Sequence, residues 1–302
     1  MRWDDFRRSD NIDDRREETG QGGFGIPGGR GGLGIGTIVV LGLVGWALGI
    51  DPRLLIGGAE MLSGGDQSTQ APPSSPRETG APTDRTGQFV AAVLGATEDS
   101  WSELLKGSGL TYEAPTLVMF SGSTRSACGM AQSAMGPFYC PNDRQVYLDT
   151  DFFKEIETRF RGCPVGSGAC QFSQAYVIAH EVGHHVQNLL GILPKAQQMQ
   201  RGMDKVEANH LQVRIELQAD CFAGVWANRS QEKWKSLEQG DVEAALQTAS
   251  AIGDDMLQRK AQGYVVPDAF THGSSEQRQR WFATGLKNGS PTNCNTFDAG
   301  QL

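Results

Sequence analysis

The sequence lacks a cluster of Lys and Arg in its C-terminal two thirds, and the whole chain of 302 residues carries a formal net charge of −8. Because phosphate binding needs clustered basic side chains, this shortage argues against nucleic acid as a partner. The chain also lacks an internal repeat, which argues against a solenoid or a propeller. Its 38% hydrophobic and 21% charged residues are typical of a globular protein, and its length suits one or two domains with a sizeable core.

Cysteine never occurs with the CxxC spacing, which argues against a zinc site built from thiolates. The even number of six is compatible with three disulfides, for which about 15 pairings exist. Two pairs are close in sequence, and we expect them to be local: Cys128 with Cys140, and Cys163 with Cys170. The third pair, Cys221 with Cys294, then follows by elimination.

One stretch without charged residues covers residues 31–50, between Arg30 and Asp51. Twenty residues of helix span roughly 30 Å, the thickness of the hydrocarbon core of a bilayer. A buried core helix or a signal peptide are the alternatives, but the charged segment in front is long for a signal peptide. We therefore expect an uncleaved transmembrane helix that attaches the protein to a membrane. More Arg residues precede it than follow it closely, so the N-terminus is predicted to be cytoplasmic.

The predicted organisation has four parts: a disordered cytoplasmic tail at 1–30, the membrane span at 31–50, a Pro-, Gly- and Ser-rich linker at 51–86 and a folded domain at 87–302. The protein would then be a single-pass protein of the inner, cytoplasmic membrane. Its folded domain would be periplasmic or extracellular. All six cysteines would lie on that outer side, where disulfides persist.

Within the folded domain, a few short strands precede several long helices, a pattern typical of an α+β fold. Alternating and apolar runs predict strands at 116–120, 138–140 and 145–149. Helical periodicity and its start and stop residues predict helices at about 88–106, 151–160, 172–192, 200–229, 241–262 and 275–288.

One of these predicted helices contains His180-Glu181-Val-Gly-His184. A helix places residues four apart on one face, with Cβ atoms about 5–6 Å apart, so the two imidazoles can converge on one Zn²⁺. With five histidines in the chain, this pattern arises by chance in only about one chain in two hundred. The neighbouring His185 lies about 100° around the helix from His184, and we interpret it as structural.

The third metal ligand is less clearly marked by the sequence. Metzincins place a histidine six residues after the second one, where this chain has Leu190, and the inverted HxxEH order is absent too. A carboxylate from a second helix remains, with water as the fourth ligand. Glu216 is the best candidate, with Asp220 one turn later as a partner for a ligand histidine. Glu207 and His210 are rivals, and the alternative interpretation of Glu216 is a solvated carboxylate on a charged helix.

Several motifs in one order resemble the bacterial putative neutral zinc metallopeptidase family. They are MRWDDFRRSDNIDDRR at the start, CGMAQSAMGPFYCPNDRQVYLD at 128–149, HEVGHHVQ at 180–187, ELQADCFAGVWA at 216–227 and HGSSEQR at 272–278. The resemblance covers nearly the whole chain and implies a gluzincin-like zincin, with a small β-sheet, an active-site helix and a mostly helical C-terminal half. It also implies one Zn²⁺ per chain, Glu216 as its third ligand and Asp220 as the partner within ExxxD.

These residues suggest a reaction in which a zinc-bound water attacks a peptide bond of a peptide or protein substrate, with Glu181 as general base. Similarity to gluzincins points to His272 as the donor to the oxyanion, with Arg278 and Arg280 as weaker options. His272 is otherwise a loop residue beside a helix cap. An extended substrate is expected to add to the strand at 145–149 as an edge strand.

Two other functions compete with that of a membrane-anchored zinc endopeptidase. One is a zinc-containing binding or scaffold ectodomain without catalysis. The other is a zinc hydrolase that acts on a non-protein amide. An intact Glu181 favours an enzyme, because a binding module needs no general base.

Overall fold

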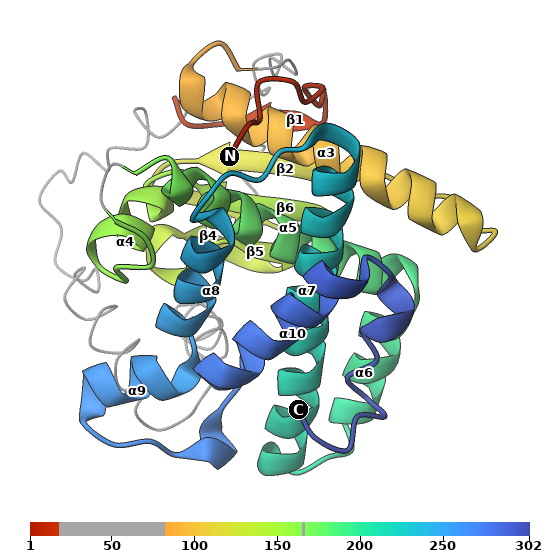
Figure 1. Ribbon diagram of the computed structural model, residues 1–302. Helices are drawn as coiled ribbons and strands as arrows, with labels where there is room; N and C mark the ends of the chain where they lie inside the picture. The colour runs from red at the N-terminus through yellow and green to blue at the C-terminus, as the bar shows by residue number, and fades with distance from the viewer. Residues whose placement is uncertain (18–81, 165–166) are drawn as a thin grey trace, which may run out of the picture.

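Short runs of β-branched and aromatic residues form a four-stranded sheet in the computed structural model, which describes residues 1–17, 82–164 and 167–302 (Figure 1). Its strands, in spatial order, are β1 (Ile12–Asp14), β2 (Thr116–Phe120), β6 (Gln145–Asp149) and β5 (Phe138–Cys140). The pairs β1–β2 and β2–β6 are parallel, and β5–β6 is antiparallel. The three strands predicted in the folded domain all belong to this sheet.

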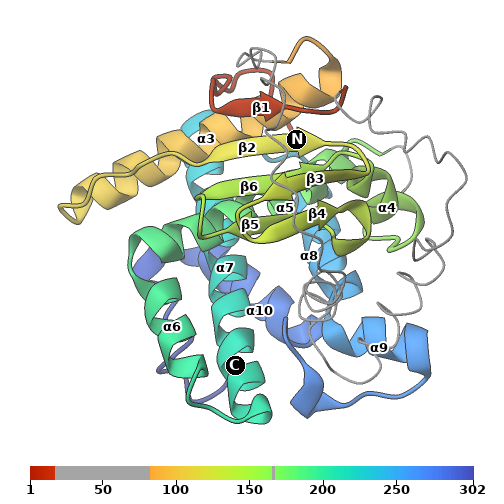
Figure 2. The same cartoon turned by 180° about the vertical axis from the view of Figure 1, so that it is seen from behind.

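Alternation along the strands gives the sheet two apolar faces. Leu117 and Met119 of β2 join the main core with the helices, whereas Val118 and Phe120 face a smaller cluster. That second face is covered by the antiparallel hairpin of β3 (Ser123–Ser126) and β4 (Gly129–Gln132), which lies in front of the sheet in Figure 2. A disulfide between Cys128 and Cys140 connects the hairpin to β5.

Helices cover the other face and build the C-terminal half. They are α3 (Arg85–Gly107), α4 (Phe152–Thr158), α5 (Ala169–Leu189), α6 (Ile192–Gln200), α7 (Lys205–Trp234), α8 (Asp241–Ala251), α9 (Asp254–Gln262) and α10 (Ser275–Asn288), with short 3-10 turns η2 (Ser133–Met135), η3 (Pro267–Ala269) and η4 (Pro291–Asn293). The predicted α+β, zincin-like class is confirmed. A small mixed sheet packs against α5, the helix that contains the HEVGH residues, and the chain after α5 is helical. The predicted helix at 241–262 is two helices, α8 and α9, because the backbone of Gly253 between them is extended. A Cβ on Gly253 would also collide with the backbone of Ser275.

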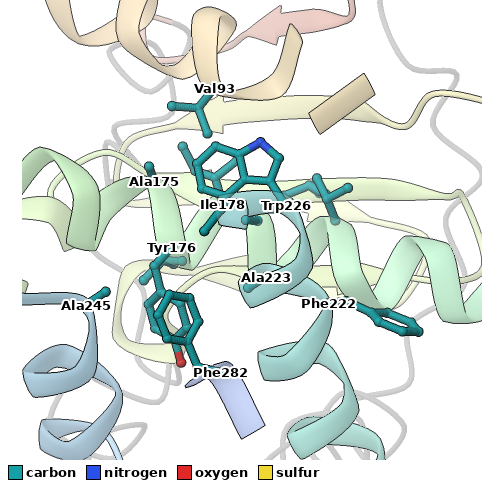
Figure 3. Packing of buried hydrophobic residues seen from close by; sticks show 14 of the residues in the cluster. Val93, Ala175, Tyr176, Ile178, Phe222, Ala223, Trp226, Ala245 and Phe282 are labelled. Carbon is teal, nitrogen blue, oxygen red and sulfur yellow. The ribbon is translucent and has the colours of Figure 1, made fainter. Parts of the chain in front are cut away.

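The main core lies where α5, α7 and α10 cross (Figure 3). Tyr176 of α5 packs edge-on against Phe282 of α10, with ring centroids 5.2 Å apart. A Cβ on Gly183 would lie 3.0 Å from the carbonyl oxygen of Ala219, so glycine in the HEVGH segment lets α5 approach α7 closely. A Cβ on Gly285 of α10 would lie 1.9 Å from a backbone oxygen of α7. These close approaches bring the polar side chains of three helices within reach of one another.

The N-terminal segment, residues 1–17, is an ordered part of this fold, so the prediction of a disordered tail is wrong for these residues. Trp3 and Phe6 are each only 3% exposed, and Trp3 packs edge-on against Phe89 of α3. Ser9, Asn11 and Arg7 all donate hydrogen bonds to the buried carboxylate of Glu98. The mixture of charged residues and glycine suggested disorder, but Trp3 packs on α3, Phe6 packs on Trp234 of α7, and Ile12 pairs with β2.

The predicted membrane span at 31–50 lies outside the described residues. Among those that are described, no helix is both long and apolar enough to cross a bilayer. The predicted topology is also contradicted by the sheet, because β1 pairs with β2 and so lies on the same side of any membrane as the domain that follows. The prediction of a single-pass inner-membrane protein, with a cytoplasmic N-terminus, a periplasmic or extracellular domain and a membrane as partner, is therefore wrong.

Candidate metal centre

Helices α5 and α7 bring together three side chains that the sequence marked as metal ligands. Nε2 of His180 lies 3.2 Å from Oε2 of Glu216, and Nε2 of His184 lies 3.3 Å from the same oxygen. One ligand atom from each of the three residues lies within 4.8 Å of those from the other two. His180 and Glu216 are buried, and the His184 side chain is 12% exposed. The three groups therefore point toward one another, on adjacent helices.

This arrangement fits a Zn²⁺ ion. Ligand atoms about 2.1 Å from a tetrahedral zinc lie roughly 3.4 Å from each other, close to the 3.2 Å and 3.3 Å that separate Oε2 of Glu216 from the two histidine nitrogens. Two imidazoles and one carboxylate form a donor set found in catalytic zinc sites, which keep a fourth position for water. The rival candidates lie elsewhere: Glu207 is exposed in the first turn of α7, and His210 pairs with Asp268 with 58% of its side chain exposed.

Asp220 lies one turn after Glu216 on α7 and is completely buried. Its Oδ1 accepts hydrogen bonds from Nδ1 of His180 at 2.9 Å and from the hydroxyl of Tyr176 at 2.6 Å. Arg278 donates to both of its oxygens, from Nε at 2.9 Å and from Nη2 at 3.0 Å. Because Nδ1 of His180 donates its hydrogen to Asp220, Nε2 is the ring nitrogen that faces Glu216 and would bind a metal ion.

Tyr176 and Arg278 were not assigned to this network from the sequence. Tyr176 precedes His180 by four residues, so helical spacing alone would place the two side chains on one face of α5. Arg278 was considered only as a donor to the oxyanion, within the motif HGSSEQR. It is instead buried, with 3% of its surface exposed, and its guanidinium donates hydrogen bonds to Asp220, Tyr176 and the carbonyl of Ile252. Arg280, the other option, pairs with Glu276 on the same helix.

The charges of the network stabilise a cation. Burial alone would raise the pKa of Asp220, but Arg278 and His180 hold it well below its usual range. Burial would also raise the pKa of Glu216, but the charges of His184 and His272 and the hydrogen bond from His180 lower it well below the usual value. Burial would lower the pKa of His180, and Asp220 raises it to about 10. The pocket thus favours positive charge at the point where the three ligand side chains meet.

Glu181 follows His180 on α5 and is 7% exposed. Among the described residues, no hydrogen bond or ion pair engages its carboxylate, in contrast to Glu216 and Asp220. A general base must have a free lone pair within reach of the proton that it takes. The carboxylate of Glu181 has such a lone pair, because no described residue hydrogen-bonds to it.

His272 lies in the loop before α10, and 51% of its side chain is exposed. Asp254 holds this loop, because its Oδ2 accepts hydrogen bonds from the backbone N–H groups of Thr271, His272 and Gly273. Partial desolvation of the half-exposed ring would lower the pKa of His272, but the charges of Glu216 and Asp254 raise it. Nδ1 of the ring lies 3.4 Å from Oδ1 of Asp254, which leaves Nε2 available for another partner.

Two further predictions concern the surroundings of the site. The strand at 145–149 is not an edge strand, because β6 lies between β2 and β5; the edge on that side of the described sheet is β5. His185 contacts β5, where its Nδ1 lies 3.1 Å from the hydroxyl of Tyr139, and its Nε2 donates to the carbonyl of Glu113. This arrangement agrees with a structural role for His185.

The six cysteines form the disulfides Cys128–Cys140, Cys163–Cys170 and Cys221–Cys294. Two of them attach to the helices that carry the candidate ligands. Cys163–Cys170 joins the segment before α5 to the first turn of that helix, and Cys221–Cys294 attaches the C-terminal segment to α7, next to Asp220.

Comparison with known proteins gives one family. The model of a family described as "Putative neutral zinc metallopeptidase" matches residues 1–297. Among curated proteins, the chain is 46% identical over 302 residues to the uncharacterized protein YpfJ of Escherichia coli strain K12, covering 98% of this chain and 99% of that protein. It is 42% identical over 265 residues to the uncharacterized protein Rv2575 of Mycobacterium tuberculosis strain H37Rv, covering 84% and 85%. No solved structure matches it significantly.

Proposed function

The chain belongs to the putative neutral zinc metallopeptidase family, and from that premise we propose that it is a zinc-dependent endopeptidase. The observation that carries the proposal is the convergence of His180, His184 and Glu216. The next residue after His180 on α5 is Glu181, whose buried carboxylate has no hydrogen bond or ion pair among the described residues. A structural zinc site is closed by four protein ligands, whereas three ligands and a neighbouring free carboxylate are typical of a hydrolytic site.

A Zn²⁺ ion held by these three residues would supply an acidified water, with a pKa of about 7, and would polarise the scissile carbonyl. Glu181 takes the proton of the attacking water and passes it to the nitrogen of the leaving amine. His272, held by Asp254 through the Nδ1 side of its ring, donates from Nε2 to the oxyanion that forms on the carbonyl. Asp220 and Arg278 keep the ring of His180 in its ligating orientation.

The edge of β5 (Phe138–Cys140) is the place where an extended peptide would add to the sheet by main-chain hydrogen bonds. Its support is the proximity of β5 to the helix with the catalytic residues. Tyr139 accepts a hydrogen bond from Asn188 of α5 at 2.9 Å and contacts His185, the neighbour of a ligand histidine. A peptide on this edge would run alongside α5.

The test is the variant Glu181→Gln, compared with Glu103→Gln, which changes an exposed glutamate on α3. We expect Glu181→Gln to bind zinc as the wild type does and to lose about 10²–10⁴-fold in the cleavage rate of an unstructured protein. Glu103→Gln should cleave at the wild-type rate. Zinc content is measured by metal analysis, and cleavage by mass spectrometry with and without a chelator.

Three outcomes would contradict the proposal. If the wild type holds no zinc, the assigned ligands are wrong. If zinc is bound but no peptide is cleaved, the site serves binding or acts on another amide. If Glu181→Gln cleaves as fast as the wild type, Glu181 is not the base.

A further inference from the structure

The two ligand histidines are supported by different chemistry. His180 donates to the carboxylate of Asp220, which Arg278 neutralises. His184 contacts an amide instead: its Nδ1 lies 2.9 Å from Oε1 of Gln187, which is completely buried on the same helix. The described structure thus places a neutral partner behind the second ligand.

The orientation of the Gln187 amide is determined by a backbone carbonyl. Its nitrogen, Nε2, lies 2.8 Å from the carbonyl oxygen of Ile215 on α7. A carbonyl oxygen only accepts hydrogen bonds, so the nitrogen of the amide must face Ile215 and its oxygen must face His184. Nδ1 of His184 must then carry a hydrogen, so Nε2, the atom that lies 3.3 Å from Glu216, is the nitrogen that can bind a metal ion.

A second glutamine extends this chain of hydrogen bonds. The other hydrogen on Nε2 of Gln187 is donated to Oε1 of Gln218 at 2.9 Å. Nε2 of Gln218 donates in turn to the carbonyl oxygen of Cys294, also at 2.9 Å, so this amide is oriented by a backbone carbonyl as well. Cys294 is bonded to Cys221 on α7, which holds that carbonyl in place.

We propose that Gln187 and Gln218 are positioning residues that hold His184 in the tautomer and ring orientation that bind the metal. The proposal rests on the zinc site proposed above. A neutral histidine can carry its hydrogen on either nitrogen, and only the form with the hydrogen on Nδ1 offers Nε2 to a metal. Both hydrogens of the Gln187 amide are already donated, to Ile215 and to Gln218, so its oxygen must accept from His184. In the alternative tautomer, the lone pair on Nδ1 of His184 would face that oxygen, and neither atom would have a hydrogen to donate.

An amide suits this position better than a second carboxylate. The buried site already contains the carboxylates of Glu181, Glu216 and Asp220, and of these only Asp220 is paired with a buried arginine. A fourth carboxylate would add an unpaired negative charge to a region with little solvent, which is costly. Gln187 accepts the hydrogen bond of His184 without adding charge.

The experiment measures zinc affinity, by competition with a chelator of known affinity, alongside the thermal stability of the metal-free protein. Gln187→Met keeps the length of the side chain and removes its hydrogen bonds. Its matched control is Gln279→Met on α10, which removes a hydrogen bond of 2.9 Å to the carbonyl of Leu246. We expect Gln187→Met to weaken zinc binding about 10–100-fold, Gln218→Met to weaken it less, and Gln279→Met to leave it unchanged.

A further variant, Gln187→Glu, separates positioning from a merely structural role. Its carboxylate still accepts from Nδ1 of His184, but it donates nothing to Ile215 and buries a charge. We expect it to lower the stability of the metal-free protein more than Gln187→Met does, yet to bind zinc more tightly than Gln187→Met. If zinc affinity follows stability across the variants, or if Gln187→Met binds zinc like the wild type, the proposal is wrong. If Gln187→Glu does not fold, the comparison of Gln187→Met with Gln279→Met decides.

These outcomes are distinct from a failure of the proposed function. A wild type that binds no zinc overturns the metal site itself. If the wild type binds zinc but cleaves no peptide, the proposed function is wrong, and the zinc-affinity measurements still test the role of both glutamines.

Discussion

One ion pair of the candidate metal centre and one ion pair of the N-terminal segment differ in how far they are exposed to water. In the metal centre, the ion pair of Arg278 and Asp220 has side chains only 4% and 0% exposed. In the N-terminal segment, Arg16 and Asp84 form a pair whose side chains are 21% and 47% exposed. The first pair is enclosed by three helices, whereas the second lies at the start of α3.

This difference decides what each pair contributes. Removing one partner of a buried pair leaves a charge without solvent or counterion, which costs about 3–5 kcal/mol. An exposed pair is worth about 0–1 kcal/mol, because water screens it and ordering the side chains costs entropy. The exposed pair therefore contributes little to holding the N-terminal segment. Its buried groups contribute more: the apolar side chains of Trp3, Phe6 and Ile12, and the terminal ammonium of Met1, which pairs with the buried Asp241.

The largest effect is expected when the buried pair is broken. Arg278→Met should lower the free energy of unfolding by about 3–5 kcal/mol, because Asp220 loses its buried counterion. The matched control Arg159→Met breaks an exposed pair with Glu155 on α4 and should cost less than about 1 kcal/mol. Urea denaturation at pH 7 measures both. Equal losses would mean that burial does not distinguish these pairs.

A smaller but still large effect is expected in the N-terminal segment. Trp3→Ala removes an aromatic side chain that packs on Phe89, and should cost about 3 kcal/mol, the low end for such a change, because the segment can detach instead of enclosing a cavity. Arg2→Ala, at an exposed side chain one residue earlier, is the control and should have little effect. Urea denaturation again gives the answer. A loss below that of the control would show that charge, and not apolar contact, holds the segment.

The smallest effect concerns the exposed pair and depends on pH. The hydrogen bond from Arg16 lowers the pKa of Asp84 to about 2, below the value of about 3.9 expected in the unfolded chain. The carboxylate therefore stabilises the fold above about pH 4, and this contribution is lost as the pH falls toward 2. Asp84→Asn keeps a cap on α3 and removes the charge, so it should cost less than about 1 kcal/mol at pH 7. The difference in melting temperature between wild type and variant should shrink between pH 4 and pH 2; a difference that grows would reverse the assignment.

The two regions also differ in how well the sequence predicted them. The spacing of His180 and His184 is local, and a helix turns it into one face without help from the rest of the chain. The strands at 116–120, 138–140 and 145–149 and the helix at 275–288 agree with their predicted bounds. For the N-terminal segment, the mixture of charged residues and glycine indicated disorder, although Trp3, Phe6 and Ile12 stand between the charges and are buried. Nothing local in the sequence shows that a strand at 12–14 pairs with one that begins more than a hundred residues later.

The sequence also could not predict which side chains pair between different helices. Which carboxylate faces the two histidines, and that Arg278 neutralises Asp220 instead of facing a substrate, depends on how α5, α7 and α10 cross. The place of β6 inside the sheet depends likewise on β5 folding back beside it.

By itself, the sequence determined the groups that can hold a metal ion, because helical geometry fixes the relation of residues three or four apart. It also determined the α+β class, because the order and period of its apolar residues do so. Only the tertiary structure decided which distant groups share the buried space around those histidines and on which side of the sheet the first seventeen residues lie. Those choices follow from long-range packing, where each polar group must find its partner among residues that are remote along the chain.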